Sequence, residues 1–491
     1  MLRKIRTILA AVFFVLITLL FLDFTGTLHH WLSWMAKIQF LPAVMALNVV
    51  VVVALVLLTL VFGRIYCSVI CPLGVFQDIL ARLRRKKNKY SYSKEVRWLR
   101  YPMLVVFIIA GVAGIGSLFQ LLAPYSSYGR IATMLFQPLW KMGNNLLAIL
   151  AERADSYAFY TVDTWMRSLP VFIIAAITLV VLVILAWRGG RTYCNTICPV
   201  GTILSFFARF SFLKIHFNED KCKNCSLCSK NCKAACIDFK THTVDYSRCV
   251  VCGNCIDSCK FGALSYSKPS GKANKTSDGN KIDTSKRSFL LASALVSTAA
   301  LAQKKEKLMD GGLAELEDKV APERQTPLTP PGSLSFQNLS TRCTGCQLCV
   351  SECPNQVLRP SNDLMHLMQP TMSYEHGYCR PECNRCSQVC PAGAIKPVDK
   401  DEKTSIQIGH AVWIKKNCVP ITDGVECGNC ARHCPSGAIE MVPLDENNEE
   451  SPMVPAINEA ACIGCGACEY VCPSRPFSAI YVEGHEVHRK I

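Results

Sequence analysis

Cysteine spacing is the feature that most limits what this chain can fold into. The chain holds six runs of four closely spaced cysteines, and four of these runs share the spacing C-x2-C-x2-C-x3-C. Such a run wraps three thiolates around one face of a [4Fe–4S] cube and sends the fourth thiolate to a neighbouring cluster. Structural zinc, the other metal that selects thiolates, instead uses separate CxxC pairs. The sequence therefore predicts six [4Fe–4S] clusters.

The predicted iron ligands fall into two groups along the chain. The first group is Cys222, Cys225, Cys228, Cys232, Cys249, Cys252, Cys255 and Cys259. The second group is Cys343, Cys346, Cys349, Cys353, Cys379, Cys383, Cys386, Cys390, Cys418, Cys427, Cys430, Cys434, Cys462, Cys465, Cys468 and Cys472. In the first group we expect crossed ligation, in which Cys259 completes the cluster of the first run and Cys232 that of the second. In the second group the sequence leaves open whether sequential or nested runs are partners.

Five of the 29 cysteines lie outside these runs, namely Cys67, Cys71, Cys194, Cys198 and Cys236. The first four belong to an internal repeat, because residues 63–74 (GRIYCSVICPLG) match residues 190–201 (GRTYCNTICPVG) at eight of twelve positions. Cysteines four residues apart face one way on a helix. Two hypotheses follow: the duplicated pairs meet in one further metal or redox centre, or they are buried structural thiols. Cys236 is expected to be a lone packed thiol.

Long apolar stretches occupy the first 200 residues and predict a helical membrane domain. The stretches are residues 8–22, 40–62, 101–123 and 169–187, and a spanning helix needs about 20 such residues. Residues 81–100 carry nine Lys or Arg and one Glu, so the positive-inside rule places this loop and the N-terminus in the cytoplasm. This topology signal accounts for much of the net charge of +16, which therefore does not indicate nucleic acid.

The predicted organisation has four parts. Residues 1–210 form a membrane domain of four spans in two pseudo-symmetric hairpins, and residues 211–267 form a cytoplasmic two-cluster α+β ferredoxin domain. Residues 268–335 form a linker, and residues 336–491 form a four-cluster domain of bacterial-ferredoxin type. Within the linker, Lys286-Arg287 precedes an apolar segment (288–302) that ends Ala-Leu-Ala, as in an export signal. This signal predicts a periplasmic C-terminal domain, and cleavage after it stays open.

These motifs, in this order, resemble two known families. Residues 1–267, with two C-x3-C-P motifs and then two cluster runs, resemble the NapH/MauN membrane ferredoxins. Residues 285–491, with a twin-arginine-like signal, the run CTGCQLC (343–349) and the variant run at Cys379, resemble the NapG/MauM polyferredoxins. The resemblance implies a multi-pass protein of the bacterial inner membrane that relays electrons from the quinol pool toward a periplasmic reductase or multihaem cytochrome. It implies a component of a quinol dehydrogenase, rather than an enzyme that converts a substrate alone.

The membrane half also resembles NosR-type and CcoG-type proteins. The CcoG resemblance implies an alternative function, reduction of copper or delivery of electrons to a metalloenzyme during assembly. In that alternative the C-x3-C-P thiols are the working groups. The flavin-attachment motif that a full NosR-like arrangement needs is absent from the sequence.

Overall fold

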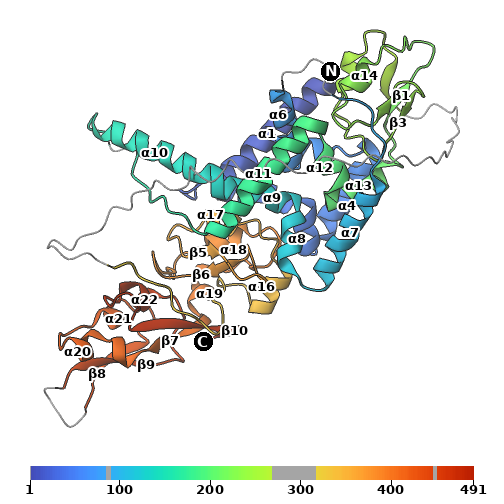
Figure 1. Cartoon of the computed structure of the whole chain (residues 1–491). Helices are drawn as coiled ribbons and strands as arrows, with labels where there is room; N and C mark the ends of the chain where they lie inside the picture. Colours follow the sequence, from blue (N-terminus) through green and yellow to red (C-terminus); the bar gives the residue numbers. More distant parts are fainter. Residues whose placement is uncertain (1, 85–89, 157, 268–316, 446–450) are drawn as a thin grey trace, which may run out of the picture.

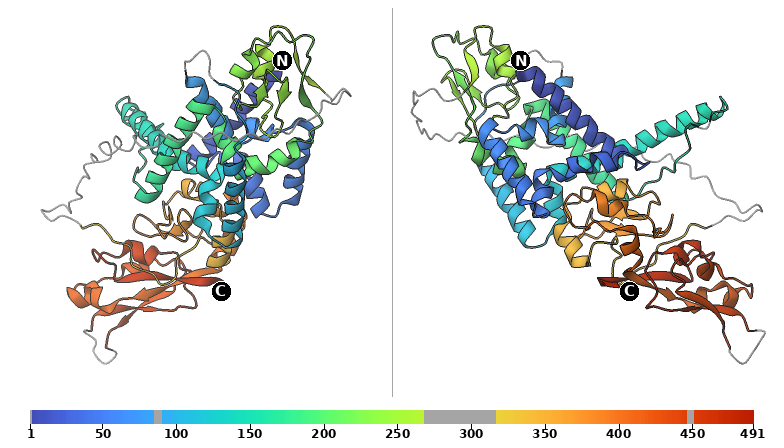
Figure 2. Two further views of the ribbon diagram at one scale, coloured as in Figure 1. Left: turned by 45° about the vertical axis from the view of Figure 1, so that its right-hand side comes forward. Right: turned by 180° about the vertical axis from the view of Figure 1, so that it is seen from behind.

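The computed structural model describes residues 2–84, 90–156, 158–267, 317–445 and 451–491. The predicted export signal at 288–302 lies outside the described residues. Figure 1 shows a central helical part with one ferredoxin-like domain at each end. The two further views in Figure 2 show the same separation, so the two iron–sulfur domains lie on opposite sides of the helical part.

The helical part consists of short and long helices in series. They are α1 (Leu2–Leu22), α2 (His29–Lys37), α3 (Phe40–Met45), α4 (Val49–Phe62), α5 (Tyr66–Val69), α6 (Pro72–Leu83), α7 (Arg97–Val112), α8 (Gly116–Leu122), α9 (Pro124–Ile131), a π-helical turn (Ala132–Phe136), α10 (Gln137–Glu152), α11 (Leu169–Gly189), α12 (Thr192–Thr196) and α13 (Pro199–Ala208). Among the described residues, α1 and α11 are the two helices that are long and apolar enough to cross a membrane.

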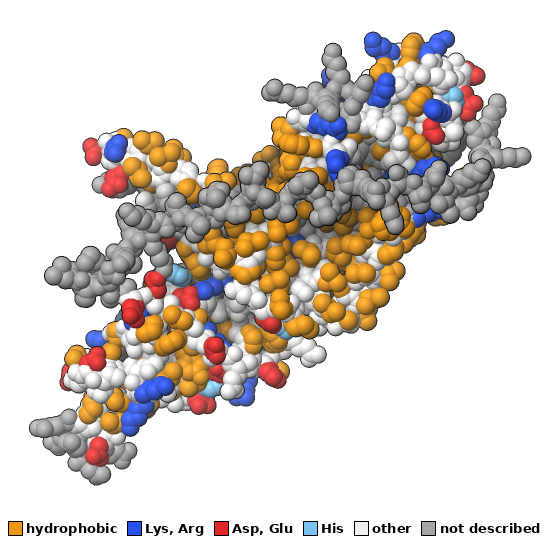
Figure 3. Space-filling view, viewed as in Figure 1, with side chains coloured by type: hydrophobic (Ala, Val, Ile, Leu, Met, Phe, Trp, Pro, Cys, Tyr) orange, Lys and Arg blue, Asp and Glu red, His pale blue; other side chains and the backbone are white. Residues whose placement is uncertain are grey.

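Two of the four expected spans are not single helices. The stretch 40–62 breaks between α3 and α4, where Leu47 has a φ of 55° and Asn48 caps α4 by accepting a hydrogen bond from the backbone of Val51. The stretch 101–123 breaks between α7 and α8, where Gly114 adopts a φ of 71°. Hydropathy averaged over 20 residues does not register these local caps and turns. Figure 3 nevertheless shows apolar side chains gathered over the central helices, and many on α4, α7 and α11 are exposed.

The first ferredoxin domain is built from two small antiparallel sheets and two short helices. Strand β1 (Lys214–Phe217) pairs with β4 (Leu264–Ser267), and β2 (Ile237–Asp238) pairs with β3 (Thr243–Val244). The helices α14 (Leu227–Lys230) and α15 (Asn254–Ser258) each carry the third cysteine of a run. The short strands close the domain around its cysteines.

The C-terminal domain repeats this plan on a larger scale. Its elements are α16 (Phe336–Arg342), α17 (Leu348–Ser351), β5 (Leu358–Pro360), β6 (Pro370–Met372), α18 (Arg385–Val389), α19 (Lys400–Thr404), β7 (Ile406–Trp413), a 3-10 turn (Lys415–Asn417), α20 (Val419–Thr422), α21 (Asn429–Arg432), β8 (Ile439–Pro443), β9 (Met453–Ile457), α22 (Ala467–Val471) and β10 (Ile480–Lys490). Strand β5 pairs with β6, β8 with β9, and the long β7 with β10, all antiparallel.

The C-terminal domain begins earlier than the expected boundary at residue 336. Lys319 donates hydrogen bonds from Nζ to the carbonyl oxygens of Glu469, Tyr470 and Cys472, at 2.6 to 3.0 Å. The backbone of Thr326 donates to Glu483 at 2.7 Å. Residues from 317 onward therefore belong to this domain and are not a linker.

Candidate iron–sulfur and thiol sites

In the first ferredoxin domain, cysteines from the two runs meet in the crossed pattern that shared ligation requires. One cavity is lined by Cys222, Cys225, Cys228 and Cys259. The second group consists of Cys232, Cys249, Cys252 and Cys255. Cys255 is buried, and the other three thiols are close enough for their charges to raise its pKa. Each group thus holds three thiols of one run and the last thiol of the other.

The structure resolves the pairing that the sequence left open in the C-terminal domain, because sequential runs meet. Two cavities are lined by Cys353, Cys379, Cys383 and Cys386, and by Cys418, Cys427, Cys430 and Cys472. The other two groups, identified by the mutual charges of their thiols, are Cys343, Cys346, Cys349 and Cys390, and Cys434, Cys462, Cys465 and Cys468. Runs one and two therefore form one unit with two thiol groups, and runs three and four form another.

The two units join end to end. The backbone N–H of Cys379 donates to the carbonyl oxygen of Cys465 at 2.9 Å, so the second and third groups are neighbours. Within the first unit, the charge of Cys386 acts on Cys349, and within the second that of Cys430 acts on Cys468. The four groups consequently follow one another from the helical part to the far tip of the domain.

The donor chemistry of these groups fits [4Fe–4S] clusters. Burial, together with the thiol of Cys390, raises the pKa of Cys346 to about 12, and burial also raises the pKa of Cys228 to about 11. Four crowded thiolates are unfavourable unless a cationic centre offsets their charge, as cluster iron does. Backbone N–H groups also point at the last sulfur of several runs, for example Ala263 to Cys259 and Ala438 to Cys434, both at 3.3 Å. Such hydrogen bonds tune cluster potentials.

The duplicated motif folds as a pseudo-symmetric pair of helical turns. Arg64 of the first copy donates from Nη2 to the carbonyl oxygen of Cys194 at 3.1 Å, and Arg191 of the second copy donates from Nη1 to the carbonyl oxygen of Cys67. Both arginines are fully buried. Gly201 cannot carry a side chain, because a Cβ would lie 2.8 Å from Arg64 Nη2 and would also collide with the Cys194 carbonyl. Each copy thus donates hydrogen bonds from its arginine to a backbone carbonyl of the other copy, and these bonds hold the two copies together.

This pairing brings all four cysteines of the repeat, Cys67, Cys71, Cys194 and Cys198, into one buried cluster, here called the four-thiol site. Burial raises the pKa of Cys198, and the charges of the other three thiols raise it further. The side chain of Gln77 donates a hydrogen bond to the sulfur of Cys194 at 3.4 Å. The backbone N–H of Gly201 donates one to the sulfur of Cys198 at 3.3 Å. Four buried thiols near one another, with donors to two of their sulfurs, form a donor set that could hold an iron–sulfur centre.

Asp78 on α6 is the charge centre beside the four-thiol site. Its carboxylate oxygens lie 2.9 Å from Arg191 Nε, 3.1 Å from Arg6 Nη1 and 3.2 Å from Lys233 Nζ. These cations come from the second repeat copy, from α1 and from the first ferredoxin domain. One buried carboxylate thus forms ion pairs with three separate parts of the chain beside the four-thiol site.

Cys236 was expected to be a lone packed thiol, and this expectation is wrong. Its sulfur lies 3.5 Å from that of Cys232, and it also hydrogen-bonds Cys249. The hydrogen bond from Cys236 is the largest cause that lowers the pKa of Cys232 to about 7. Cys236 therefore touches two ligands of the second group, and its place four residues after Cys232 was the signal that the sequence offered.

Helix α9 connects the four-thiol site to the C-terminal domain. All eight of its residues are buried. Tyr193, the neighbour of Cys194, donates from its hydroxyl to the carbonyl oxygen of Leu122 at 3.2 Å, just before α9. At the other side, a Cβ on Gly129 would collide with the carbonyl oxygen of Cys346. Arg130 lies between, close enough for the charges of both Tyr193 and Cys346 to act on it.

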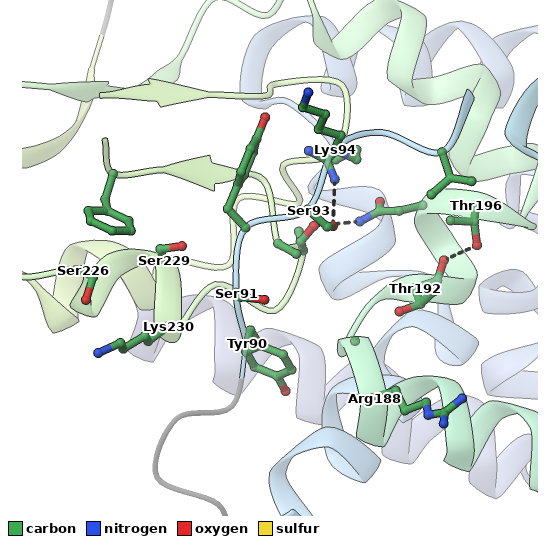
Figure 4. Close-up of a pocket in the computed structure, with 18 of the residues that line it drawn as sticks. Tyr90, Ser91, Ser93, Lys94, Arg188, Thr192, Thr196, Ser226, Ser229 and Lys230 are labelled. Carbon is green, nitrogen blue, oxygen red and sulfur yellow. Dashed lines mark hydrogen bonds between the residues drawn. The ribbon is translucent and has the colours of Figure 1, made fainter. Parts of the chain in front are cut away.

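A separate cavity of about 680 Å³ opens where the helical part meets the first ferredoxin domain (Figure 4). Arg84, Lys94, Arg188, Lys230 and Arg248 are among its lining residues. No cysteine is among the described residues that line it.

Comparison with known families agrees with these groupings. A family described as 4Fe-4S binding domain matches residues 44–90 and 169–218, another described as 4Fe-4S dicluster domain matches residues 342–394 and 425–475, and a third, also 4Fe-4S binding domain, matches residues 242–265. The first covers both copies of the internal repeat. No solved structure matches the chain.

Several ferredoxin-type proteins are similar to the chain. The methylamine utilization ferredoxin-type protein MauM of Methylobacillus flagellatus is 31% identical over 166 residues, which are 33% of this chain and 70% of MauM. The ferredoxin-type protein NapH of Escherichia coli is 28% identical over 228 residues, which are 45% of this chain and 67% of NapH. An uncharacterized protein of Methanocaldococcus jannaschii is 24% identical over 275 residues, which are 54% of this chain and 86% of that protein.

Proposed function

Because the chain belongs to the family of ferredoxin-type iron–sulfur electron-transfer proteins that includes NapH, MauN and MauM, we propose that it is a membrane-bound relay carrying electrons from the quinol pool to a periplasmic reductase. Clusters held by thiolates exchange single electrons with little rearrangement, and the protein sets their potentials. The relay holds six [4Fe–4S] clusters, and the four-thiol site is a further redox or metal centre.

The proposed topology has four crossings of the inner membrane. Helices α1 and α11 each cross alone, and α4 and α7 supply the other two crossings, with α3 packed against α4 and α8 folded back beside α7. The exposed apolar side chains on these helices support the proposal, since they would face lipid. The first ferredoxin domain then lies in the cytoplasm beside the basic loop, and the C-terminal domain lies in the periplasm.

The observation that carries the proposal is the buried connection between the two sides. Arg6 on α1 donates to the carbonyl oxygen of Ser68 beside the four-thiol site, whereas Phe21 on the same helix packs near Gly129, beside Cys346. Fifteen residues of helix separate Arg6 from Phe21, a rise of about 22 Å. The hydrocarbon core is about 30 Å thick. The four-thiol site and the first C-terminal cysteine group therefore contact the same helix at points about 22 Å apart along its axis.

A second candidate function is favoured by the four-thiol site itself. Four buried thiols in one place are a ligand set that selects Cu(I), zinc or iron–sulfur centres. In this alternative the chain is a metalloreductase or an assembly factor like CcoG, and the four-thiol site handles the metal that is reduced or delivered. The clusters then serve as its electron supply.

The test uses the full chain, purified without oxygen in detergent and reduced with a menaquinol analogue. We expect reduced cluster signals by electron paramagnetic resonance from both iron–sulfur domains. Cys67→Ala should confine reduction to one domain. Reduction confined to one domain in the unaltered protein contradicts the relay. A Cys67→Ala protein that still reduces both domains but no longer reduces Cu(II) supports the alternative.

A further inference from the structure

Three ligating side chains converge where the helical part meets the C-terminal domain, and none of them is a cysteine. They are Asp23, in the loop after α1; His29, the first residue of α2; and Glu352, directly after α17. Their ligand atoms all lie within 4.8 Å of one another, and all three residues are buried. Two of the residues come from the helical part and one from the C-terminal domain, so this cluster bridges the interface.

The cluster leaves polar atoms without partners. His29 Nδ1 and both carboxylate oxygens of Glu352 are buried and make no hydrogen bond, and the Glu352 side chain has no exposed surface. The distance from His29 Nδ1 to Glu352 Oε2 is 3.8 Å, too long for a hydrogen bond. Buried polar groups are almost always paired in native proteins, so three unpaired atoms at one point indicate a missing ligand.

Asp23, by contrast, is held firmly in place. Its Oδ1 accepts a hydrogen bond from the backbone of Gly26 at 2.9 Å, and its Oδ2 accepts one from Leu28 at 2.7 Å. Thr25 also donates to Oδ1 from its backbone and its hydroxyl, and the backbone of His29 donates to Oδ2. These bonds hold the carboxylate in place without a ligand, with one oxygen within 4.8 Å of the ligand atoms of His29 and Glu352. A site that is positioned before its ligand arrives is what tight binding requires.

The charge of the cluster indicates that the missing ligand is a cation. Two carboxylates meet there, and neither oxygen of Glu352 has a hydrogen-bond partner among the described residues. Arg385 is near enough to act on Glu352, but among the described residues no ion pair joins the two. An anionic or purely hydrogen-bonding ligand would leave the two carboxylates facing each other, whereas a divalent cation would satisfy both.

We propose that Asp23, His29 and Glu352 bind one divalent transition-metal ion, separate from the clusters and from the four-thiol site. One imidazole nitrogen with carboxylate oxygens suits zinc, manganese or ferrous iron. The ion would fasten the outer loop of the helical part to the C-terminal domain directly beside Cys353. It would thereby hold the first C-terminal cysteine group against α9. The proposal does not depend on the direction of electron flow or on the electron donor.

The test is metal binding by the full chain with its clusters in place. After dialysis against EDTA, with cluster iron counted to show that the clusters remain, Mn²⁺ is titrated in and followed by its electron paramagnetic resonance signal. We expect one Mn²⁺ per chain, displaced by Zn²⁺. Glu352→Gln and His29→Ala should each weaken Mn²⁺ binding by at least about tenfold.

The chain offers a matched control for each variant. Glu382, like Glu352, stands directly before a cluster cysteine but is exposed, and His30 is the exposed neighbour of His29. Glu382→Gln and His30→Ala should bind Mn²⁺ as the unaltered chain does. If Glu352→Gln loses cluster iron, the Mn²⁺ affinity of His29→Ala decides the test, because His29 lies on the helical part and does not neighbour a cluster cysteine in sequence. Absence of stoichiometric Mn²⁺ and Zn²⁺ binding, or equal binding by His29→Ala and the unaltered chain, overturns the proposal.

Discussion

Replacing Asp78 by asparagine tests how the parts around the four-thiol site are held together. The substitution keeps the shape of the side chain and removes its charge. It leaves Arg191, Arg6 and Lys233 buried without their shared counter-ion, since all three are at least nine-tenths buried at the side chain. Breaking a buried ion pair from one side is strongly destabilising, because the remaining charge is uncompensated.

The expected magnitude follows from this geometry. Loss of one partner of a buried pair costs about 3–5 kcal/mol, and the three cations that share Asp78 place the cost toward the upper end. At about 2–4 °C of midpoint per kcal/mol for a part of 150–250 residues, the apparent melting temperature should fall by roughly 10–20 °C. The arginine in the second repeat copy also fixes the Cys67 carbonyl, so the four-thiol site should loosen as well.

The pH dependence has a definite sign. Burial alone would raise the pKa of Asp78, but the charges of Arg191, Lys233 and Arg6 outweigh it and hold the pKa well below its usual value. Asp78 therefore contributes its full stability above the pKa of an unfolded aspartate, about 3.9, and loses it only as the pH falls through the lower folded value. The difference between the Asp78→Asn protein and the unaltered chain should be constant from about pH 5 to 8.

The assay is thermal unfolding of the full chain in detergent, with Asp257→Asn as the matched control. Asp257 pairs with Arg3 at 3.3 Å, but the side chains are 37% and 47% exposed. An exposed pair of this kind contributes below about 1 kcal/mol. If Asp78→Asn lowers the midpoint no further than Asp257→Asn does, the reasoning about the buried carboxylate is refuted.

Three further substitutions test the contacts around the clusters. Gly129→Ala places a Cβ against the carbonyl oxygen of Cys346, so it should lower the free energy of unfolding by about 1–3 kcal/mol and slow the quinol-driven reduction of the C-terminal clusters. The control Gly143→Ala, whose Cβ would meet open space, should change neither quantity. Cys236→Ala should keep the iron count of all six clusters but lower one cluster potential in a redox titration, because a hydrogen bond to a ligand sulfur is lost; loss of iron would instead make Cys236 a ligand. Lys403 contacts the backbone carbonyl of Cys383 and the sulfur of Cys379, so Lys403→Met removes a positive charge and should lower the reduction potential of the cluster that these cysteines hold. Lys400 is exposed, and Lys400→Met should leave every potential unchanged.

The features that the sequence predicted are those that local spacing encodes. Three thiols of each run lie within a few residues of one another, so the run alone specifies a cluster-binding loop. The repeat at residues 63–74 and 190–201 was visible as a duplication, and the structure folds it as one. The four apolar stretches were visible too, but hydropathy could not show that Asn48 and Gly114 interrupt two of them, because caps and turns act on one or two residues.

Only the tertiary structure shows the contacts between residues that are far apart in the chain. The sequential pairing of the C-terminal runs, the meeting of the four repeat cysteines and the approach of α9 to Cys346 all depend on packing over tens to hundreds of residues. The same holds for the buried meeting of His29 and Glu352, which are 323 residues apart in the chain. Sequence spacing determines which residues can hold a cluster, whereas only the packing of the whole chain determines where those clusters lie relative to one another, because long-range contacts leave no periodic signal in a single sequence.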